Sequence, residues 1–460
     1  MIKRFGRILK TMLPTPFSIA LLLTALTFIL AFTLTSSSLS GVDRVVEVLG
    51  FWEQGLWDKP LLAFAVQMML MLVLGHALAL TKPVDSLMSY ATRFCTSTAR
   101  AAAIVTFLTV IVSLFNWGLG LIFGAILARK VGEHTARLNG QLNYALIGAA
   151  GYSGLMVWHA GISGSAPIKA AEQDHLAGLM GKTMSAEQLE LLPKSITFSD
   201  TVFGSMNLVA MLLLILVLPA FMYWLGKRTK KMTSLPQVSQ TAIELEDPAE
   251  GAEKLDVSRL FSLFFGLLIV TYSIYLASNS YGTKGVGFIT PNFINLLLLG
   301  LCLSFHQNIR AFLKAIDKAI GGSSGILIQF PLYFGILGIM TNSGLVQQFS
   351  DFFVRVSTET TFPIYTFFSA GLVNIFVPSG GGQWGVQGPI IIQASMELGV
   401  SLPKAIMALA YGDQLTNMLQ PFWALPLLGI TGLKAKNILP YTLALMGVGI
   451  VIFISVLLMF

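Results

Sequence analysis

Charged residues are scarce in this sequence. Of its 460 residues, 11% are Asp, Glu, Lys or Arg and 55% are hydrophobic, with a mean hydropathy of +0.75. A soluble globular protein carries about 25% charged residues, so this chain lacks the polar surface that a water-facing fold of its size requires. The scarcity of charge excludes disorder, secreted disulfide scaffolds and nucleic-acid binding, and it predicts an all-α polytopic membrane protein.

Cysteines and nucleotide-binding patterns are also scarce. Cys95 and Cys302 are far apart in the chain without the spacing of a metal site, so we interpret both as small buried apolar residues. The sequence has no GxxxxGK[ST] phosphate-binding loop and no GxSxG nucleophile elbow, which argues against ATP-driven transport and hydrolase chemistry. We therefore expect no metal, no cofactor and no enzymatic activity.

The apolar runs predict about nine membrane-spanning helices. The expected spans are Pro16–Thr35, Pro60–Leu80, Leu142–Ala160, Val202–Leu225, Leu260–Ala277, Thr290–Phe305, Gly322–Met340, Leu402–Leu428 and Ile438–Phe460. The first run follows basic residues, as in a signal peptide, but it is about 20 residues long and can span a bilayer. We therefore predict an uncleaved first helix with a cytoplasmic N-terminus.

Two further apolar segments, 101–128 and 362–397, are interrupted by helix-breaking residues. The sequences on both sides of the first segment are net basic, so the positive-inside rule places both of its ends in the cytoplasm. Such a segment is a re-entrant hairpin, and the span count predicts that the second hairpin opens to the outside. The net acidic stretches 36–59 and 162–200 are expected to be outside loops.

The two halves of the chain resemble each other, and an amphipathic stretch precedes each hairpin. The matched sequences are Thr106–Thr109 with Thr366–Ser369, Asn116 with Asn374, and Ala145–Tyr152 with Ile406–Tyr411. A repeat whose halves enter from opposite sides is typical of secondary transporters. We predict a first inverted repeat over residues 1–226, a cytoplasmic linker over 227–259 and a second inverted repeat over 260–460.

The second interruption, within VPSGGGQWGVQGP, predicts irregular backbone at membrane depth, which occurs only around a cavity or inside protein. Pro378 and the three glycines favour a turn, after which a helix can start near Gln383 with the amides of Gly381, Gly382 and Gln383 at its N-terminus. A helix N-terminus attracts a carboxylate. The alternative is a kinked helix with close small-residue packing. The candidate substrate-binding residues here are Ser379, Gly380, Gly381, Gly382, Gln383 and Trp384.

Asp413 lies in the middle of a predicted span, and ionisable groups at that depth are usually functional. The polar residues that share its helical face by spacing are Thr416, Asn417 and Gln420. Pro421 and Pro426 predict a break in this span. The alternative is that Asp413 lies at the water interface or caps a half-helix.

In the first half, Asn116, Trp117 and Gly118 form the weaker candidate tip. The polar residues expected opposite this tip are Tyr152, Ser153, His159 and Ser163. His159 can exchange a proton near neutral pH, although a hydrogen-bonded packing role fits it equally well.

The stretches NIFVPSGGGQWGVQGPI and AYGDQLTNMLQPFWALPLLGI together resemble the paired signature of the bacterial short-chain fatty acid transporter family, the AtoE-like carriers. The resemblance implies an inner-membrane secondary carrier for acetoacetate, butyrate or similar short carboxylates. It also implies a place in the ion-transporter superfamily, whose members are commonly dimers with a scaffold domain and a transport domain that moves like an elevator.

The coupling ion is not settled by the residues. Dicarboxylate relatives carry Ser-Asn-Thr at both tips, whereas here the tips read Asn-Trp-Gly and Pro-Ser-Gly-Gly-Gly, so we favour protons over sodium. Asp413, Thr416 and His159 are the candidate coupling residues. A sodium-coupled carrier of dicarboxylates or other organic anions is the main alternative. A membrane-embedded acyl-transfer enzyme that uses Ser163 and His159 is a weaker one.

Overall fold

The computed structural model describes residues 15–138, 140–181, 184, 186–229, 250–284, 288 and 290–460. Every regular element in this part of the chain is a helix, which confirms the expected all-α fold. Eight of its segments are long and apolar enough to cross a membrane, so the chain is a multi-pass membrane protein. Much of the predicted linker, at 230–249, lies outside the described residues.

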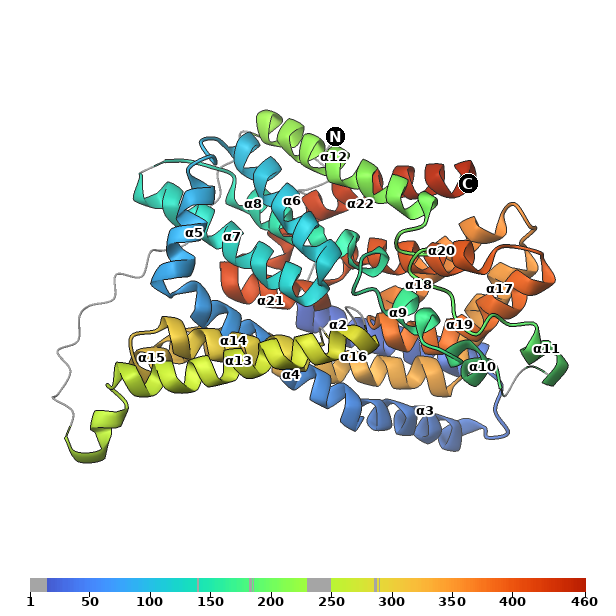
Figure 1. Ribbon diagram of the computed structural model, residues 1–460. Coiled ribbons are helices and arrows are strands. Elements are labelled where there is room, and N and C mark those ends of the chain that lie inside the picture. The colour runs from blue at the N-terminus through green and yellow to red at the C-terminus, as the bar shows by residue number, and fades with distance from the viewer. Residues whose placement is uncertain are drawn as a thin grey trace.

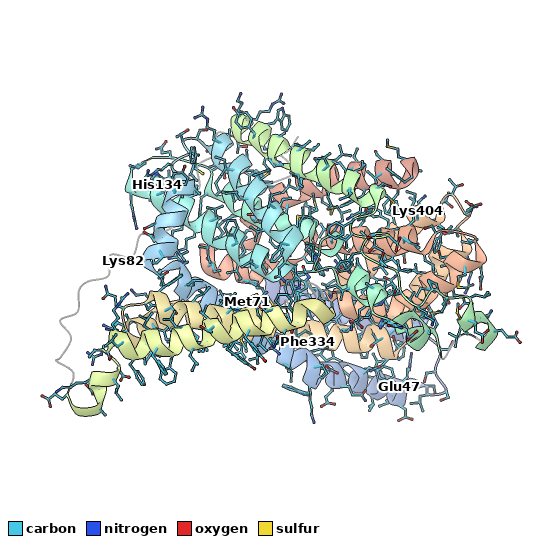
Figure 2. All side chains as sticks on the ribbon, viewed as in Figure 1. Glu47, Met71, Lys82, His134, Phe334 and Lys404 are labelled. Carbon is cyan, nitrogen blue, oxygen red and sulfur yellow. The ribbon has the colours of Figure 1, made fainter. Side chains whose placement is uncertain are left out.

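Ionisable and apolar side chains are separated along the length of the molecule. Figure 2 shows Lys82 and His134 at one end and Glu47 and Lys404 at the other, while Met71 and Phe334 lie between them. This arrangement places an apolar band between two polar ends, as a bilayer requires.

One group of helices, in the lower half of Figure 1, comes from the beginnings of the two halves. It consists of α2 (Pro16–Leu34), α3 (Gly41–Leu56), α4 (Lys59–Ala79), α13 (Arg259–Lys284), α14 (Pro291–Phe305), α15 (Ile309–Ile320) and α16 (Ser324–Asn342). Helix α14 runs parallel to α4. Gln67 donates to Asn292 at 2.9 Å near the start of the contact, and the His306 ring meets the carbonyl oxygen of Ala77 at 3.1 Å near its end.

Helix α3 was not expected from the sequence, because residues 36–59 are polar enough to predict a loop. In the structure α3 packs against α16, and Gly55 lies directly against the backbone of Gly335. Arg44 is buried between α2 and α3, where it donates to the carbonyl of Ala31 at 3.2 Å and pairs with Glu47. Its partners within the packed helices satisfy this charge, and hydropathy alone cannot reveal such a pairing.

The second group of helices carries both hairpins and lies above the first group in Figure 1. Its long helices are α5 (Lys82–Thr92), α6 (Thr98–Phe115), α7 (Trp117–Arg137), α8 (Tyr144–Tyr152), α12 (Ser205–Arg228), α17 (Leu345–Arg355), α18 (Phe362–Phe376), α19 (Gly380–Glu397), α20 (Leu402–Thr416), α21 (Pro421–Thr431) and α22 (Ala435–Met459). Its short elements are η1 (Ser153–Met156), η2 (Trp158–Ala160), α9 (Ser165–Ala171), α10 (His175–Met180), α11 (Ala186–Glu190) and η6 (Asn417–Leu419). Two further short elements, η3 (Gly251–Leu255) and η5 (Gly321–Ser323), precede α13 and α16 of the first group.

Both interrupted segments form helical hairpins. The α6–α7 hairpin turns at Asn116, whose backbone is extended and whose side chain caps α7 by accepting from the Leu119 amide at 3.0 Å. The α18–α19 hairpin turns at 377–379 and has the predicted bounds. In Figure 1, α6 and α7 lie on the left and α18 and α19 on the right, so the two hairpins approach each other from opposite sides.

Two of the expected spans are broken in the middle. Between α20 and α21 the chain passes through η6 and an extended Gln420, which confirms the predicted break at Pro421. Pro426 lies inside α21 without a break, so that part of the expectation is wrong. The expected span Leu142–Ala160 is also interrupted, after Tyr152, by η1 and η2, which the sequence did not predict because no proline marks the site.

Candidate functional site

A cavity of about 250 Å³ lies where the two hairpin tips meet α4 and α16. The tips, the two broken segments and both of these helices contribute to its wall. The lining includes Phe64, Trp117, Trp158, Tyr333, Gly380 and Trp423. Among the described residues that line the cavity none is charged, and aromatic rings make up much of its surface. Such a cavity suits a small ligand with an apolar body.

The tip of the second hairpin forms part of the wall of this cavity. Helix α19 begins at Gly380, three residues earlier than the sequence predicted, because Ser379 serves as its N-cap. The Gly382 amide donates to Ser379 Oγ at 3.2 Å and the Gln383 amide to the Ser379 carbonyl at 2.7 Å. Within the described residues, the amides of Gly380 and Gly381 have no partner, so these two groups replace the expected set of three.

Gly380 is held in a tight space. A Cβ atom at this position would lie 2.8 Å from Trp158 Cη2, 2.9 Å from His159 Cε1 and 3.1 Å from Asp413 Oδ2. The start of α19 therefore touches both broken segments at once. The positive end of its dipole therefore lies beside the Asp413 carboxyl group.

His159 and Asp413, two of the candidate coupling residues, are paired at this point. His159 Nδ1 contacts Asp413 Oδ2, and both side chains are buried. His159 Nε2 is 3.0 Å from the Ala166 amide, which can only donate. The Nε2 atom is therefore the acceptor, and the ring proton lies on Nδ1, the atom that contacts Asp413 Oδ2.

Asn374 connects the polar residues of the α20 break. Its amide group donates to the Asp413 carbonyl at 2.7 Å, to Thr416 Oγ1 at 2.9 Å and to Asn417 Oδ1 at 2.9 Å. Gln420 in turn donates to the Asn374 carbonyl. The sequence-based candidates did not include Asn374, although its match to Asn116 in the repeat could have identified it.

The tip of the first hairpin is more completely satisfied. The Trp117 amide donates to Ser163 Oγ at 2.9 Å, so this serine holds the tip in place. The Trp117 ring lines the cavity and meets the Trp423 ring edge-on, with 5.4 Å between centroids. Gly118 lies instead against Met71, on the α4 side. Of the candidates at this tip, only Trp117 contributes to the cavity wall.

The remaining candidates make contacts elsewhere. Gln383 donates to the Ala370 carbonyl at 2.9 Å and to Gln387 at 2.8 Å, within the second hairpin. Trp384 is buried and donates to His175 Nε2 at 3.1 Å. Neither residue lines the cavity, nor do Asn116, Asn417 and Gln420. These side chains hold the hairpins and the break together.

The family model for the short chain fatty acid transporter matches residues 1–460. The chain belongs to this family. A protein of Escherichia coli strain K12 whose name assigns it to short-chain fatty acid transport is 36% identical over 470 residues, covering 100% of this chain and 99% of that protein. A Haemophilus influenzae protein with the same name is 35% identical over 455 residues, covering 96% of each. Members of the family are transporters and not enzymes.

A solved structure is also similar to this chain. The YdaH transporter of Alcanivorax borkumensis is 15% identical, with a TM-score of 0.43 and coverage of 96% of this chain and 97% of that one.

Proposed function

We propose that this transporter is a secondary carrier that moves short monocarboxylates, such as butyrate and acetoacetate, together with protons. The observation that supports the substrate class is the pair of unpartnered amides at Gly380 and Gly381, two residues that line a cavity without a basic side chain. A carboxylate needs hydrogen-bond donors, and the N-terminus of α19 supplies them together with a favourable dipole.

The size and surface of the cavity favour a short chain with one charged group. Its volume of about 250 Å³ corresponds to about eight water molecules at about 30 Å³ each. The rings of Phe64, Trp117 and Trp423 provide an apolar surface for the hydrocarbon part. A dicarboxylate would place its second charge against these rings without a cationic partner, which is unfavourable.

The proposed proton carrier is Asp413. While Ala166 donates to His159 Nε2, that ring cannot accept a second proton, so a proton that enters the pair is taken up by the carboxylate. A substrate carboxylate at Gly380 would lie close to Asp413. Two negative charges repel strongly at low dielectric, so substrate binding favours the protonated carboxyl group. This linkage gives proton–substrate symport.

Sodium coupling is the second candidate, supported by one observation. The carboxamide oxygens of Asn374, Gln383 and Gln420 are buried and have no hydrogen-bond partner among the described residues. Neutral oxygen ligands suit a hard cation such as Na⁺. A sodium ion near these oxygens could supply the charge compensation that protonation of Asp413 supplies in the first scheme.

The proposal extends to the way the carrier works in the membrane. The group of α2–α4 and α13–α16 would be the scaffold, and the group with both hairpins would move across the bilayer as an elevator. The cavity at the boundary of the two groups agrees with this division. From the family resemblance we add a homodimer in the bacterial inner membrane, with the N-terminus in the cytoplasm.

Transport into proteoliposomes tests the proposal. Vesicles loaded with unlabelled butyrate should take up labelled butyrate by counterflow, and an inward proton gradient should drive accumulation that an uncoupler abolishes. Absence of counterflow with both butyrate and acetoacetate would contradict the substrate class. Accumulation that follows a sodium gradient and ignores the uncoupler would replace the proton by sodium.

A further inference from the structure

Two polar groups in the cavity wall have no partner. The indole N–H of Trp158 and the hydroxyl group of Tyr333 are both buried, with 4% and 1% of their side chains exposed. Neither forms a hydrogen bond within the described residues, and both residues line the cavity. A buried donor without an acceptor is unfavourable. The two groups therefore indicate a place for a ligand oxygen that the carboxylate site does not account for.

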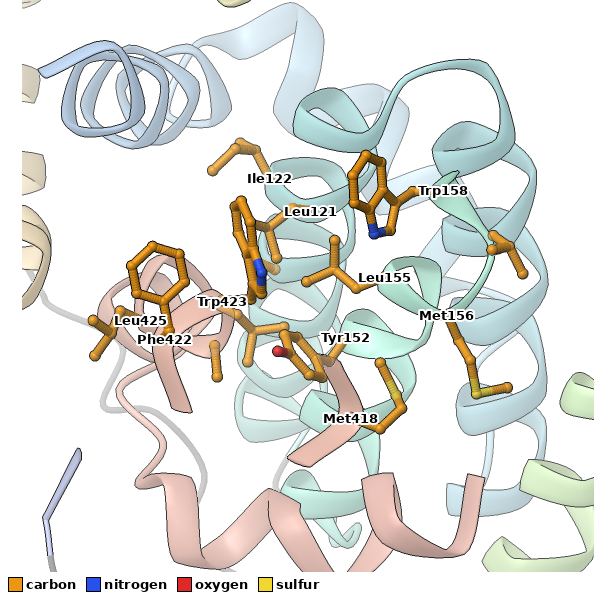
Figure 3. Packing of buried hydrophobic residues seen from close by; sticks show 14 of the residues in the cluster. Leu121, Ile122, Tyr152, Leu155, Met156, Trp158, Met418, Phe422, Trp423 and Leu425 are labelled. Carbon is orange, nitrogen blue, oxygen red and sulfur yellow. The ribbon is translucent and has the colours of Figure 1, made fainter. Parts of the chain in front are cut away.

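The position of Trp158 sets where this oxygen would lie. Its Cη2 edge faces Gly380, and its ring stacks on His159 with 4.5 Å between centroids and an interplanar angle of 14°. The indole nitrogen belongs to the same rigid ring as this edge, and both Trp158 and Gly380 line the cavity. Figure 3 shows this nitrogen on the side of the ring that faces Leu155 and Trp423.

Tyr333 reaches the cavity from the other group of helices. It belongs to α16, and its ring packs edge-on against Phe422 with 4.9 Å between centroids. This contact fixes the ring and leaves the hydroxyl group as its only polar feature. A ligand that bonds to both Trp158 and Tyr333 would thus bridge the hairpin group and the group of α2–α4 and α13–α16.

We propose that Trp158 Nε1 and Tyr333 Oη form a second oxygen site, which binds an acceptor oxygen near the carboxylate of the substrate. An indole N–H only donates and a phenol can donate, so a carbonyl oxygen satisfies both groups. A short carboxylate with an oxo group on carbon 3 carries such a second oxygen close to its carboxylate. The inference rests on the proposed carboxylate site at Gly380 and Gly381, and it predicts that acetoacetate binds more tightly than butyrate.

Competition in the counterflow assay tests the second oxygen site. Unlabelled acetoacetate and butyrate each compete with labelled butyrate, and the ratio of their half-inhibitory concentrations is the readout. Tyr333→Phe should raise the half-inhibitory concentration of acetoacetate by about 3- to 10-fold, because it removes one neutral hydrogen bond. The value for butyrate should stay unchanged, because butyrate has no second oxygen. Tyr441→Phe, whose hydroxyl group bonds to Asn143 away from the cavity, is the matched control and should leave the ratio as in the wild type.

The outcomes separate the two proposals. Wild-type protein that exchanges both acids equally well, or a Tyr333→Phe variant with an unchanged ratio, overturns the second oxygen site and leaves the carrier function intact. Wild-type protein that exchanges neither acid overturns the carrier function itself. Trp158→Phe provides a second variant that removes the N–H group and keeps an aromatic ring. Trp158→Phe should shift the ratio of the two half-inhibitory concentrations in the same direction as Tyr333→Phe. An unchanged ratio in Trp158→Phe also overturns the site.

Discussion

The side chains of His159 and Asp413 come from opposite halves of the chain and are paired inside the molecule, where both expected spans are broken. Trp158 stacks on His159 and lines the cavity, and Gly380 lies against both members of the pair. The pair is therefore in direct contact with the start of α19, where we place the substrate carboxylate. A change of charge at the pair acts directly on that site.

Asp413→Asn should separate exchange from accumulation. The amide has nearly the shape of the carboxyl group but takes up no proton, so a gradient can no longer drive net uptake. Counterflow, which needs no net release of a proton, should remain. Both quantities are measured with labelled butyrate in proteoliposomes, with and without an inward proton gradient. Full accumulation by this variant would contradict proton coupling through Asp413.

Gly380→Ala and Gly381→Ala form a matched pair at the hairpin tip. The methyl group at Gly380 would collide with the rings of Trp158 and His159, whereas at Gly381 it meets no atom within 4 Å. Overpacking of this kind costs about 1–3 kcal/mol, so Gly380→Ala should slow counterflow by about tenfold or more. Gly381→Ala should slow counterflow less than Gly380→Ala, because its methyl group meets no protein atom and alanine favours the helix. Equal losses in the two variants would argue against the observed packing at the tip.

Asn374→Ala should destabilise the folded transporter. The change leaves the Asp413 carbonyl, Thr416 and Asn417 without their shared donor. An unsatisfied buried polar group costs about 1–3 kcal/mol, so the thermal unfolding temperature of the purified protein in detergent should fall clearly. Gln393→Ala, which removes only a hydrogen bond to Glu397 on the exposed surface, should leave that temperature almost unchanged. A drop of similar size in both variants would contradict the central role of Asn374.

The predicted re-entry of the first hairpin can be tested by thiol labelling. In a background with Cys95→Ala and Cys302→Ala, single cysteines at the exposed positions Ser86 and Arg137 should react with an impermeant reagent only from the cytoplasm. A cysteine at Thr358, before the second hairpin, should react only from outside. Labelling of Ser86 and Arg137 from opposite faces would make the α6–α7 pair an ordinary crossing.

The structure provides a reason to expect this result. Lys130, near the end of α7, forms an ion pair of 2.5 Å with Asp85 in α5. The chain before the hairpin and the chain after it are thus in direct contact. Because ionisable groups avoid the hydrocarbon core, this contact favours a common water-facing side for both.

The sequence by itself determined the class of the protein and the places where its helices break. A low content of charge excludes a water-facing fold, and this holds for any arrangement of the helices. The turn at 377–379 and the break before Pro421 follow from proline, glycine and capping residues that act on their own backbone. The bounds of the second hairpin were therefore predictable, since only local interactions decide them.

The tertiary structure decided the chemistry at those breaks. The sequence indicated Asp413 and His159 separately, but they are 254 positions apart in the chain and only the folded structure shows that they pair. The sequence predicted the amides of Gly381, Gly382 and Gln383 as the anion-binding groups. In the structure Ser379 accepts from the last two, and among the described residues the amides of Gly380 and Gly381 have no partner. Helix α3, with its buried Arg44, was not predicted, because the partners of Arg44 are known only from the packed helices. A polar group shows its role only through its partner, and partners from distant parts of the chain are brought together by packing.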